Sequence, residues 1–191
     1  MYICNQGEEM DPFEEFDLLD VSLLSNLHKV IQDENDRIEN EKKLDSEIFN
    51  RSKCQCAGEA YEFSIEQRLK SQFQNDFLIV SSGLLIIGLY KQTEIYFKAV
   101  VAEHHDDKSK KVRDKLCSLN SSLQYYDAIN ELRLLNNCVK HAGIVSKPLA
   151  DNYPKWVEGE LLGNLLLDYE RLIADVRRYV SEHEKYIEKY T

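Results

Sequence analysis

The chain has 191 residues, of which 43% are hydrophobic and 30% charged, with only seven Gly and three Pro. This composition excludes a collagen-like or turn-rich all-β chain, and the apolar fraction is too high for a chain that is disordered throughout. The net charge is −10, and residues 1–60 hold 15 acidic against 6 basic side chains, whereas residues 61–191 hold 19 against 18. A whole-chain basic footprint for duplex nucleic acid is therefore absent.

The N-terminal third is predicted to be helical. Asp11–Pro12 is a good helix start, because Asp can cap a helix and Pro fits its first turn. The apolar stripe of this helix is expected to be Phe13, Phe16, Leu19, Leu23, Leu27, Val30 and Ile31. Residues 32–47 are expected to be a solvated helical extension. We expect residues 1–58 to form this acidic helix and a loop, and residues 59–191 to form a helical bundle, together one compact unit.

A second helix is predicted from about residue 59 to 104, with Gln74–Asp76 and Ser81–Gly83 as the places where it can bend or break. Its half from Phe77 to Val101 is apolar nearly all round, which predicts a buried central helix. The longest apolar stretch, residues 77–90, is shorter than the roughly 20 residues that a membrane-spanning helix needs. We therefore expect no membrane segment.

Two more helices are predicted, one from about residue 122 to His141 with Gly143 as its terminator, and the last from about residue 160 to 190. A loop with Pro148, Pro154 and Trp156 separates them. The apolar stripes are Leu123, Tyr126, Ile129, Leu132, Leu135 and Val139 in the first helix, and Leu161, Leu165, Tyr169, Leu172, Val176, Val180 and Ile187 in the last. Four or five helices without an alternating strand pattern predict an all-α fold, an antiparallel helical bundle.

The five cysteines are scattered, and Cys54 and Cys56 form their one close pair. No second pair or nearby His completes a zinc site, so we expect free thiols in a reducing cytoplasm. The run His104–Asp107 is a weak metal candidate, because adjacent residues on a helix do not face one another. Residues 1–17 lack the basic region of a signal peptide. We expect a cytoplasmic protein without a bound metal or cofactor.

A polar stripe near the end of the third predicted helix could carry chemistry. Arg133, Asn137 and His141 follow at four-residue steps, so they share one side of a helix beside its apolar face. A cation, an amide and an imidazole at this edge could bind a phosphate and move a proton. A structural role is the alternative, because Lys140 and His141 lie in the last turn, where cations favour the helix dipole.

A basic run, Lys108–Lys115, lies between two predicted helices. Clustered cations attract a polyanion, so Lys110, Lys111 and Arg113 are candidate phosphate-binding residues. A solvated helix start is the alternative interpretation of the same run.

The run Asn136–His141 (Asn-Asn-Cys-Val-Lys-His) resembles the motif of HEPN domains (higher eukaryotes and prokaryotes nucleotide-binding), written Arg-Asn-x-x-x-His. The earlier segment Leu89–Lys98, with Glu94, resembles the family's core helix that often bears an acidic residue. The resemblance covers about residues 60–190. It implies a bundle of four to five helices that dimerises, so that two motifs face one cleft. Many such domains are metal-independent endoribonucleases of toxin–antitoxin, phage-defence or CRISPR-linked systems.

The resemblance implies roles for individual residues. His141 takes the role of general acid or base when a ribose 2′-OH attacks the adjacent phosphate, and Asn137 takes the place of the motif's Asn. Asn136 stands where the motif has Arg, so Arg133, one turn earlier, is the first candidate to stabilise the phosphate and Lys140 the second. Asn136 and Lys140 are also candidate substrate contacts.

Three functions stay open at this point. A neutral Asn136 cannot supply the charge that a phosphorane needs, so a non-catalytic module that binds RNA, a nucleotide or a protein is the alternative to a ribonuclease. A structural helical-bundle subunit is the third. The expected partners are a second copy of the chain, RNA, and an antitoxin or defence-system protein.

Overall fold

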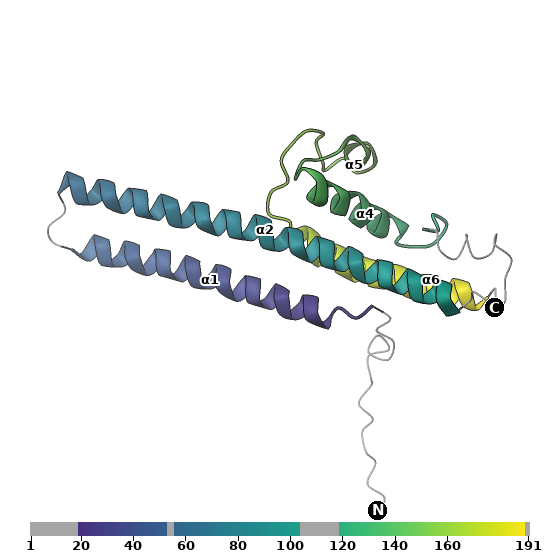
Figure 1. Cartoon of the computed structure of the whole chain (residues 1–191). Coiled ribbons are helices and arrows are strands. Elements are labelled where there is room, and N and C mark those ends of the chain that lie inside the picture. The colour runs from purple at the N-terminus through teal and green to yellow at the C-terminus, as the bar shows by residue number, and fades with distance from the viewer. Residues whose placement is uncertain (1–18, 53–55, 104–118, 190–191) are drawn as a thin grey trace, which may run out of the picture.

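The computed structural model describes residues 19–52, 56–103 and 119–189, and these residues form helices and no strand. The helices are α1 (Ser22–Arg51), α2 (Ala57–Glu103), α4 (Tyr126–His141), α5 (Lys147–Asn152) and α6 (Leu166–Glu188). α1 and α2 lie side by side as an antiparallel hairpin, and its free end projects beyond the rest of the molecule (Figure 1). α4 and α6 pack against α2 and against each other. The predicted all-α class is confirmed for the described part of the chain.

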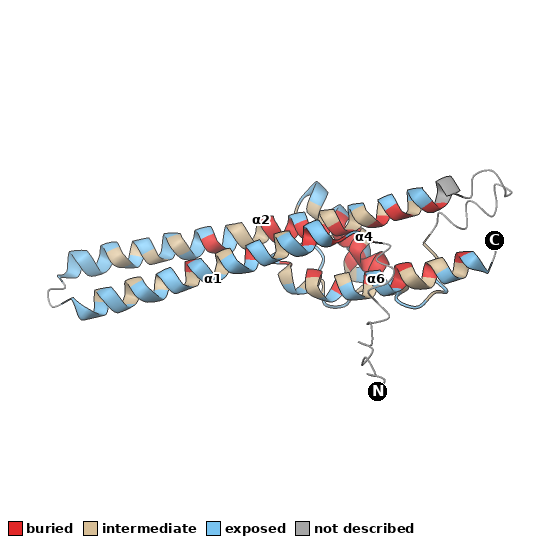
Figure 2. Ribbon diagram, turned by 90° about the horizontal axis from the view of Figure 1, so that it is seen from below, coloured by how far each residue is buried: buried red, intermediate tan, exposed pale blue. Residues whose placement is uncertain are grey.

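The hydrophobic core lies where α2 meets α4 and α6, and the buried residues gather there, whereas the far half of the hairpin is mostly exposed (Figure 2). Fully buried side chains from these three helices are Leu85, Ile86, Leu89, Ile129, Leu132, Leu135, Tyr169, Leu172, Val176 and Tyr179. Burying a Leu or Val side chain contributes roughly 1.5–3 kcal/mol. This cluster therefore supplies most of the hydrophobic stabilisation that places α4 on α2.

α1 faces α2 with a stripe that matches the predicted one only in part, since Ile31 belongs to both. Leu24, Ile31 and Ile38 are buried at seven-residue spacing, which is the repeat of two helices wound around each other. Leu23 and Val30, which the prediction placed on the apolar face, are 72% and 61% exposed. The sequence offers apolar residues at both sets of positions, and contact with α2 selects one of them.

The predicted continuous helix from Asp11 is wrong where the structure tests it. Leu19 and Val21 are buried but lie outside any helix, and α1 begins at Ser22. The amide and the hydroxyl of Ser22 both donate to the Asp20 carboxylate, at 3.1 and 2.6 Å. The start proposed at Asp11 itself lies outside the described residues.

Residues 32–47, predicted to be a solvated extension, are helical but pack against α2. Its contacts are largely polar: Gln74 donates to the side chain of Asn35 at 2.8 Å and accepts from Lys42 at 3.1 Å. Near the end of the hairpin the rings of Phe49 and Phe63 stack with centroids 4.2 Å apart. The far half of the hairpin is therefore joined by paired polar groups and one aromatic pair rather than by a continuous apolar seam.

α2 is continuous, so neither suggested break is present in it. The hydroxyls of Ser81 and Ser82 donate to the carbonyls of Phe77 and Ile79 at 2.6 and 3.3 Å, which satisfies both groups within the helix. A Cβ at Gly88 would lie 2.5 Å from a methyl group of Leu24, so glycine permits the close approach of α1.

α2 is buried on one side only. On its other side the side chains of Val80 and Leu84 are more than half exposed. Among the described helices it alone is long and apolar enough to cross a membrane by length and composition, and 33% of that apolar window is buried inside the molecule. The prediction of a central helix apolar nearly all round is thus correct in composition and only partly correct in burial.

The C-terminal helices are present with shifted ends, but Leu161, predicted on the apolar stripe, lies outside α6 and is 79% exposed. α6 begins at Leu166 rather than near residue 160, because the preceding backbone pairs with the segment that follows α4. The amide of Val145 donates to the carbonyl of Glu160 at 2.8 Å, and that of Leu162 to Gly143 at 2.7 Å. The six-residue α5 falls inside the segment that was predicted to be a loop.

A buried carboxylate joins α4 to the following loop and to α6. Glu131 is 4% exposed, and its Oε1 accepts from the indole nitrogen of Trp156 and from Arg171, and pairs with Lys155, each at 2.9 Å. We call these four residues the Glu131 cluster. It fixes the loop that carries Trp156 against the bundle.

Candidate functional site

α4 is oriented by its ends as well as by its apolar face. Tyr125, directly before it, has a φ of +61°. Gly143, beyond its last residue, has a φ of +64°, and its amide donates to the carbonyl of Cys138 at 2.9 Å. This is the left-handed terminator that the sequence predicted. The buried Leu132 and Leu135 hold the opposite face of α4 to the core.

The predicted stripe lies on the surface of α4. Asn137 and His141 are exposed, and Arg133 is partly buried. Within the described residues neither Asn137 nor His141 makes a side-chain hydrogen bond, so both are accessible to a ligand.

Arg133 and His141 do not converge on one point within a single chain. They are eight residues apart, which is about 12 Å along a helix. The Arg133 guanidinium donates to the side-chain oxygen of Asn130 at 2.9 Å, one turn toward the N-terminus and away from His141. The expected arrangement, in which Arg133 stabilises a phosphate while His141 acts as general acid or base beside it, is therefore not assembled by one copy of α4.

Asn136 lies inside the bundle. It is 1% exposed, and its side-chain oxygen has no hydrogen-bond partner among the described residues. The structure thus keeps the residue that replaces the motif's Arg away from the surface where Asn137 and His141 lie, and Asn136 does not form a substrate contact there.

Lys140 lies beside His141 in the sequence and faces α2. Its ammonium group is 5.8 Å from the centroid of the Tyr90 ring. Across this contact lies Glu94, whose pKa is lowered first by a hydrogen bond from Lys91, at 3.0 Å, and then by the charges of Lys91, Lys98 and Lys140. The acidic residue singled out in the sequence is therefore surrounded by cations.

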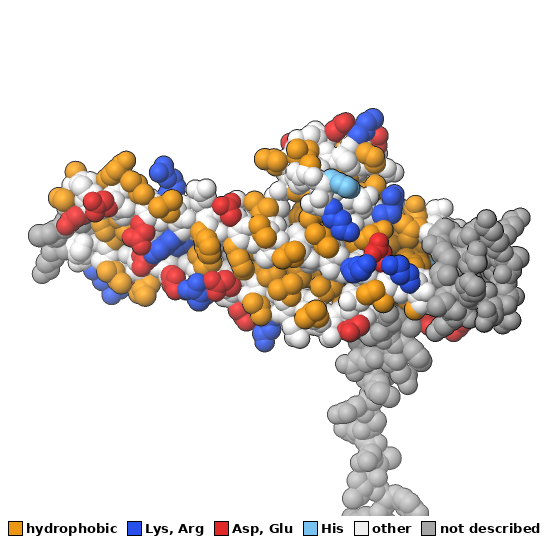
Figure 3. Space-filling model, in the orientation of Figure 1, with side chains coloured by type: hydrophobic (Ala, Val, Ile, Leu, Met, Phe, Trp, Pro, Cys, Tyr) orange, Lys and Arg blue, Asp and Glu red, His pale blue; other side chains and the backbone are white. Residues whose placement is uncertain are grey.

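These observations define a basic face formed by Lys91, Lys98, Arg133 and Lys140 around Glu94. Four cations and one carboxylate give it a formal charge of about +3. Lys and Arg side chains gather around an acidic one over α2 and α4, with a histidine next to them (Figure 3). The face stands out because the chain as a whole carries a charge of −10.

An apolar pocket of about 270 Å³ opens within the basic face. Its walls include the rings of Tyr90 and Phe97, with Leu119 and Ile129, and its rim includes Arg133 and Lys98. Burial raises the pKa of the Tyr90 hydroxyl, so this ring stays neutral at physiological pH. An aromatic pocket edged by cations suits a flat ring that carries a phosphate.

The sequence did not single out Lys91, Lys98 or Tyr90. The two lysines are seven residues apart with Glu94 between them, so they share one side of α2. That spacing could have been noticed, but nothing in the sequence says that this side of α2 faces the stripe of α4.

Several expectations lie outside the described residues. They concern Lys110, Lys111 and Arg113 of the basic run, and the run His104–Asp107. Of the cysteines in the described part, Cys56 and Cys138 are free thiols. Among the described residues no group of three or more His, Cys, Asp or Glu side chains is placed to hold a metal ion.

No family model, curated protein or solved structure matches the chain. Its function can therefore be inferred only from its own residues and from the short motif resemblance.

Proposed function

We propose that this protein is a HEPN-like module that binds single-stranded RNA through the basic face. The observation that carries the proposal is the set of four cations around Glu94, next to the pocket formed by Tyr90 and Phe97, on a chain that is otherwise acidic. Clustered cations attract phosphates, and exposed aromatic rings stack on unpaired bases.

The size of the face favours a single strand over a duplex. On each of two helices a pair of cations lies two turns apart, and the pocket of about 270 Å³ holds a flat ring that must leave its stack to enter. A duplex keeps its bases stacked and paired, so no base face is free to enter the pocket. His141 and Asn137 lie on the same side of α4 and provide hydrogen-bonding groups near the basic face.

Binding is tested by fluorescence anisotropy with a labelled 20-nucleotide RNA, at several salt concentrations, for wild type and a Lys98→Gln/Lys140→Gln double variant. Each phosphate contact on a single strand contributes about −0.7 to the slope of log K against log salt, so the double variant should lose about 1.4 from that slope. The matched control is Lys29→Gln/Lys43→Gln, which removes two exposed lysines of α1.

Equal weakening by the control pair would show that only net charge matters, and would contradict the assignment of the site. Tight binding of a free nucleotide with no gain from a longer strand would redirect the proposal from RNA to a nucleotide. Absence of binding by wild type at low salt would reject both.

A metal-independent ribonuclease of a defence or toxin–antitoxin system is the second candidate, and one observation favours it. His141 is exposed in the last turn of α4, so an imidazole is available there as a general acid or base. Arg133 points away within one chain. A homodimer in which a second copy brings its cation to His141 would complete the site.

Cleavage is tested by incubating RNA, and DNA of the same sequence, with wild type and His141→Ala in EDTA. A 2′-OH that attacks the adjacent phosphate and expels the 5′-oxygen leaves a 2′,3′-cyclic phosphate, so RNA alone should be cut and His141→Ala should be inactive. RNA that is bound but uncut by wild type would leave the binding module as the function.

A further inference from the structure

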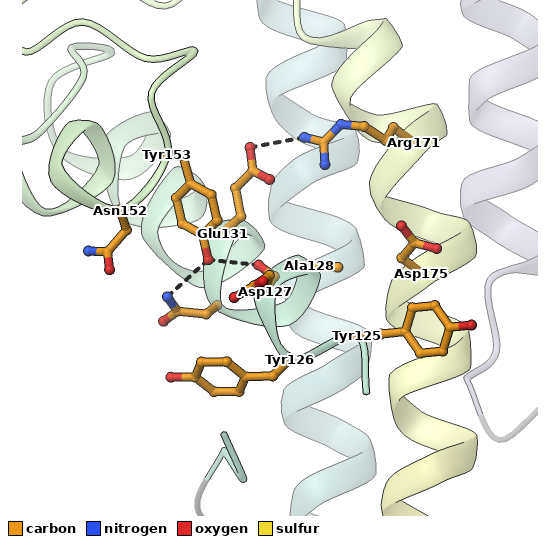
Figure 4. A pocket seen from close by; sticks show the side chains of 10 residues that line it. Tyr125, Tyr126, Asp127, Ala128, Glu131, Asn152, Tyr153, Arg171 and Asp175 are labelled. Atoms are coloured by element: carbon orange, nitrogen blue, oxygen red, sulfur yellow. Dashed lines mark hydrogen bonds and ion pairs between the residues drawn. The ribbon is translucent and has the colours of Figure 1, made fainter. Parts of the chain in front are cut away.

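α2 contacts other helices on three of its sides, and among the described residues its fourth side is open. Gln74 faces α1, Ser82 faces the start of α6, and Gly83 lies against α4. The α6 side of the bundle is held by contacts within the chain, such as the one between Arg171 and Glu131 (Figure 4). Figure 3 looks onto the open side, where hydrophobic side chains gather over the middle of the hairpin.

The open side of α2 carries residues at alternating steps of four and three, which is the heptad spacing of a helix that packs along another helix. We call these residues the α2 seam: Glu66, Lys70, Phe73, Phe77, Val80, Leu84, Ile87, Lys91, Glu94 and Lys98. All of them are exposed or partly exposed, and Phe73, Val80 and Leu84 are more than half exposed. An apolar stripe of this length on a surface indicates a contact with another molecule.

The α2 seam is complementary to itself when a second copy runs antiparallel to it. Its middle is apolar, and each of its ends carries charges of both signs. With a two-fold axis at the level of Ser82, each seam residue meets a different seam residue of the second copy. The pairs are Val80 with Leu84, Phe77 with Ile87, Phe73 with Lys91, Lys70 with Glu94, and Glu66 with Lys98. Apolar groups thus meet apolar groups, opposite charges meet, and one ammonium group meets an aromatic ring.

Other arrangements match the seam less well. Moving the second copy by one heptad in either direction places Glu94 opposite a ring, that of Phe63 or that of Phe77. A parallel pair would put each residue opposite its own copy, so that Lys98 would meet a like charge. A lipid surface offers no match for charges of both signs at each end of the stripe. The pattern therefore favours an antiparallel second copy as the occupant.

The charges at the ends of the seam differ in how far the chain already uses them. Lys98 is exposed and makes no hydrogen bond or ion pair in the described part of the chain. Glu66 pairs with Lys70 at 2.8 Å, but its side chain is 60% exposed, so this surface pair leaves the carboxylate accessible to a second cation. Lys70 already contacts Asp45 and Glu66, so its meeting with Glu94 contributes least. The pair of Glu66 with Lys98 is the one that tests the register.

We propose that this protein forms a homodimer in which the two α2 helices pack antiparallel along the α2 seam. The contact covers the apolar window of α2, of which 33% is buried inside a single chain. None of the motif residues of α4 lies on the seam. Lys91 and Lys98 also belong to the basic face, so the partner helix and an RNA strand compete for them. The dimer itself does not rest on RNA binding.

The oligomeric state of the full chain is measured by sedimentation equilibrium, without RNA and under reducing conditions that keep the exposed Cys56 from linking two copies. We expect a monomer–dimer equilibrium with a dissociation constant of about 10 μM or lower. Leu84→Glu places a charge in the middle of the seam and should raise that constant by at least about tenfold. The matched control is Leu167→Glu on α6, 78% exposed, which should dimerise as wild type does. Circular dichroism checks that both variants keep their helices.

Charge reversal tests the register. Glu66→Lys and Lys98→Glu each replace two attractive contacts of the dimer by repulsive ones, so each should raise the dissociation constant about tenfold. The combined variant restores opposite charges at both ends of the seam. Its dissociation constant should return to within about threefold of the wild-type value.

Several results would overturn the proposal. One is a chain that stays monomeric at about 100 μM, and co-sedimentation of that monomer with phosphatidylglycerol vesicles would make the seam a lipid contact instead. Another is a Leu84→Glu variant that dimerises as wild type does, or a Leu167→Glu variant that is weakened equally, since either would place the interface elsewhere. A combined charge variant no tighter than the single ones would reject the antiparallel pairing.

Discussion

Replacing Glu131 by Gln removes one negative charge from the Glu131 cluster and keeps the shape of the side chain. Three donors lie at 2.9 Å from one oxygen of this buried carboxylate. Hydrogen bonds to a charged group contribute about 1.5–3 kcal/mol each, against about 0.5–1.5 kcal/mol for neutral pairs. The difference is about 1 kcal/mol per contact before solvent is considered.

Exposure to water reduces the free-energy difference summed over the three contacts. The side chains of Lys155 and Arg171 are 41% and 42% exposed, so water replaces much of what they lose, and their shares are small. The indole of Trp156 is less exposed than these two side chains, so water compensates less for its loss. We therefore expect Glu131→Gln to lower the free energy of unfolding by about 1–2 kcal/mol, which is a drop in Tm of roughly 2–8 °C for a chain of this size.

Thermal and urea unfolding, followed by circular dichroism at neutral pH, measure this change. Glu158→Gln is the matched control, because Glu158 is exposed, and it should stay within about 0.5 kcal/mol of wild type. If Glu131→Gln is as stable as that control, the carboxylate does not hold the loop to the bundle and the reasoning fails.

Three other predictions concern stability. Leu132→Ala in the core should cost about 2–5 kcal/mol in urea unfolding, whereas Leu167→Ala, 78% exposed, should cost less than about 0.5 kcal/mol; similar losses would contradict the described packing. Gly143→Ala should cost about 1–2 kcal/mol in the same assay, because its φ is +64°, and an unchanged midpoint would contradict that conformation. Burial raises the pKa of Tyr169 to about 12, so the folded state keeps a proton that the unfolded chain releases near pH 10. The free energy of unfolding should then fall between about pH 10 and 12, and a Tyr169→Phe variant with the same decline would rule out this origin.

The sequence was sufficient to predict the helices whose apolar residues recur over several turns. The pattern through Leu132 and Leu135, and the pattern from Leu165 to Ile187, both mark buried faces of real helices. Local periodicity could not choose between two apolar stripes on α1, since that choice is made by α2 in the folded state. It also missed α5, whose six residues span less than two turns.

The candidate site was predictable in its position but not in its arrangement. Spacing alone placed Arg133, Asn137 and His141 on one side of α4. The direction of the Arg133 side chain depends on its contact with Asn130, and the basic face depends on which side of α2 lies opposite Lys140. Both depend on tertiary packing, and a single sequence without homologues carries no signal for it.

The sequence separations of the contacts suggest an order of folding. Phe49 and Phe63 of the hairpin stack across 14 residues, whereas α6 meets α4 through Arg171 and Glu131 across 40 residues, and Ser82 accepts from the amide of Leu165 across 83 residues. Contacts between near residues close shorter loops and form faster than contacts between distant ones. We expect the α1–α2 hairpin to form first and the docking of α6 to come late, so amide hydrogen exchange should find α6 protected after α2 in a refolding experiment.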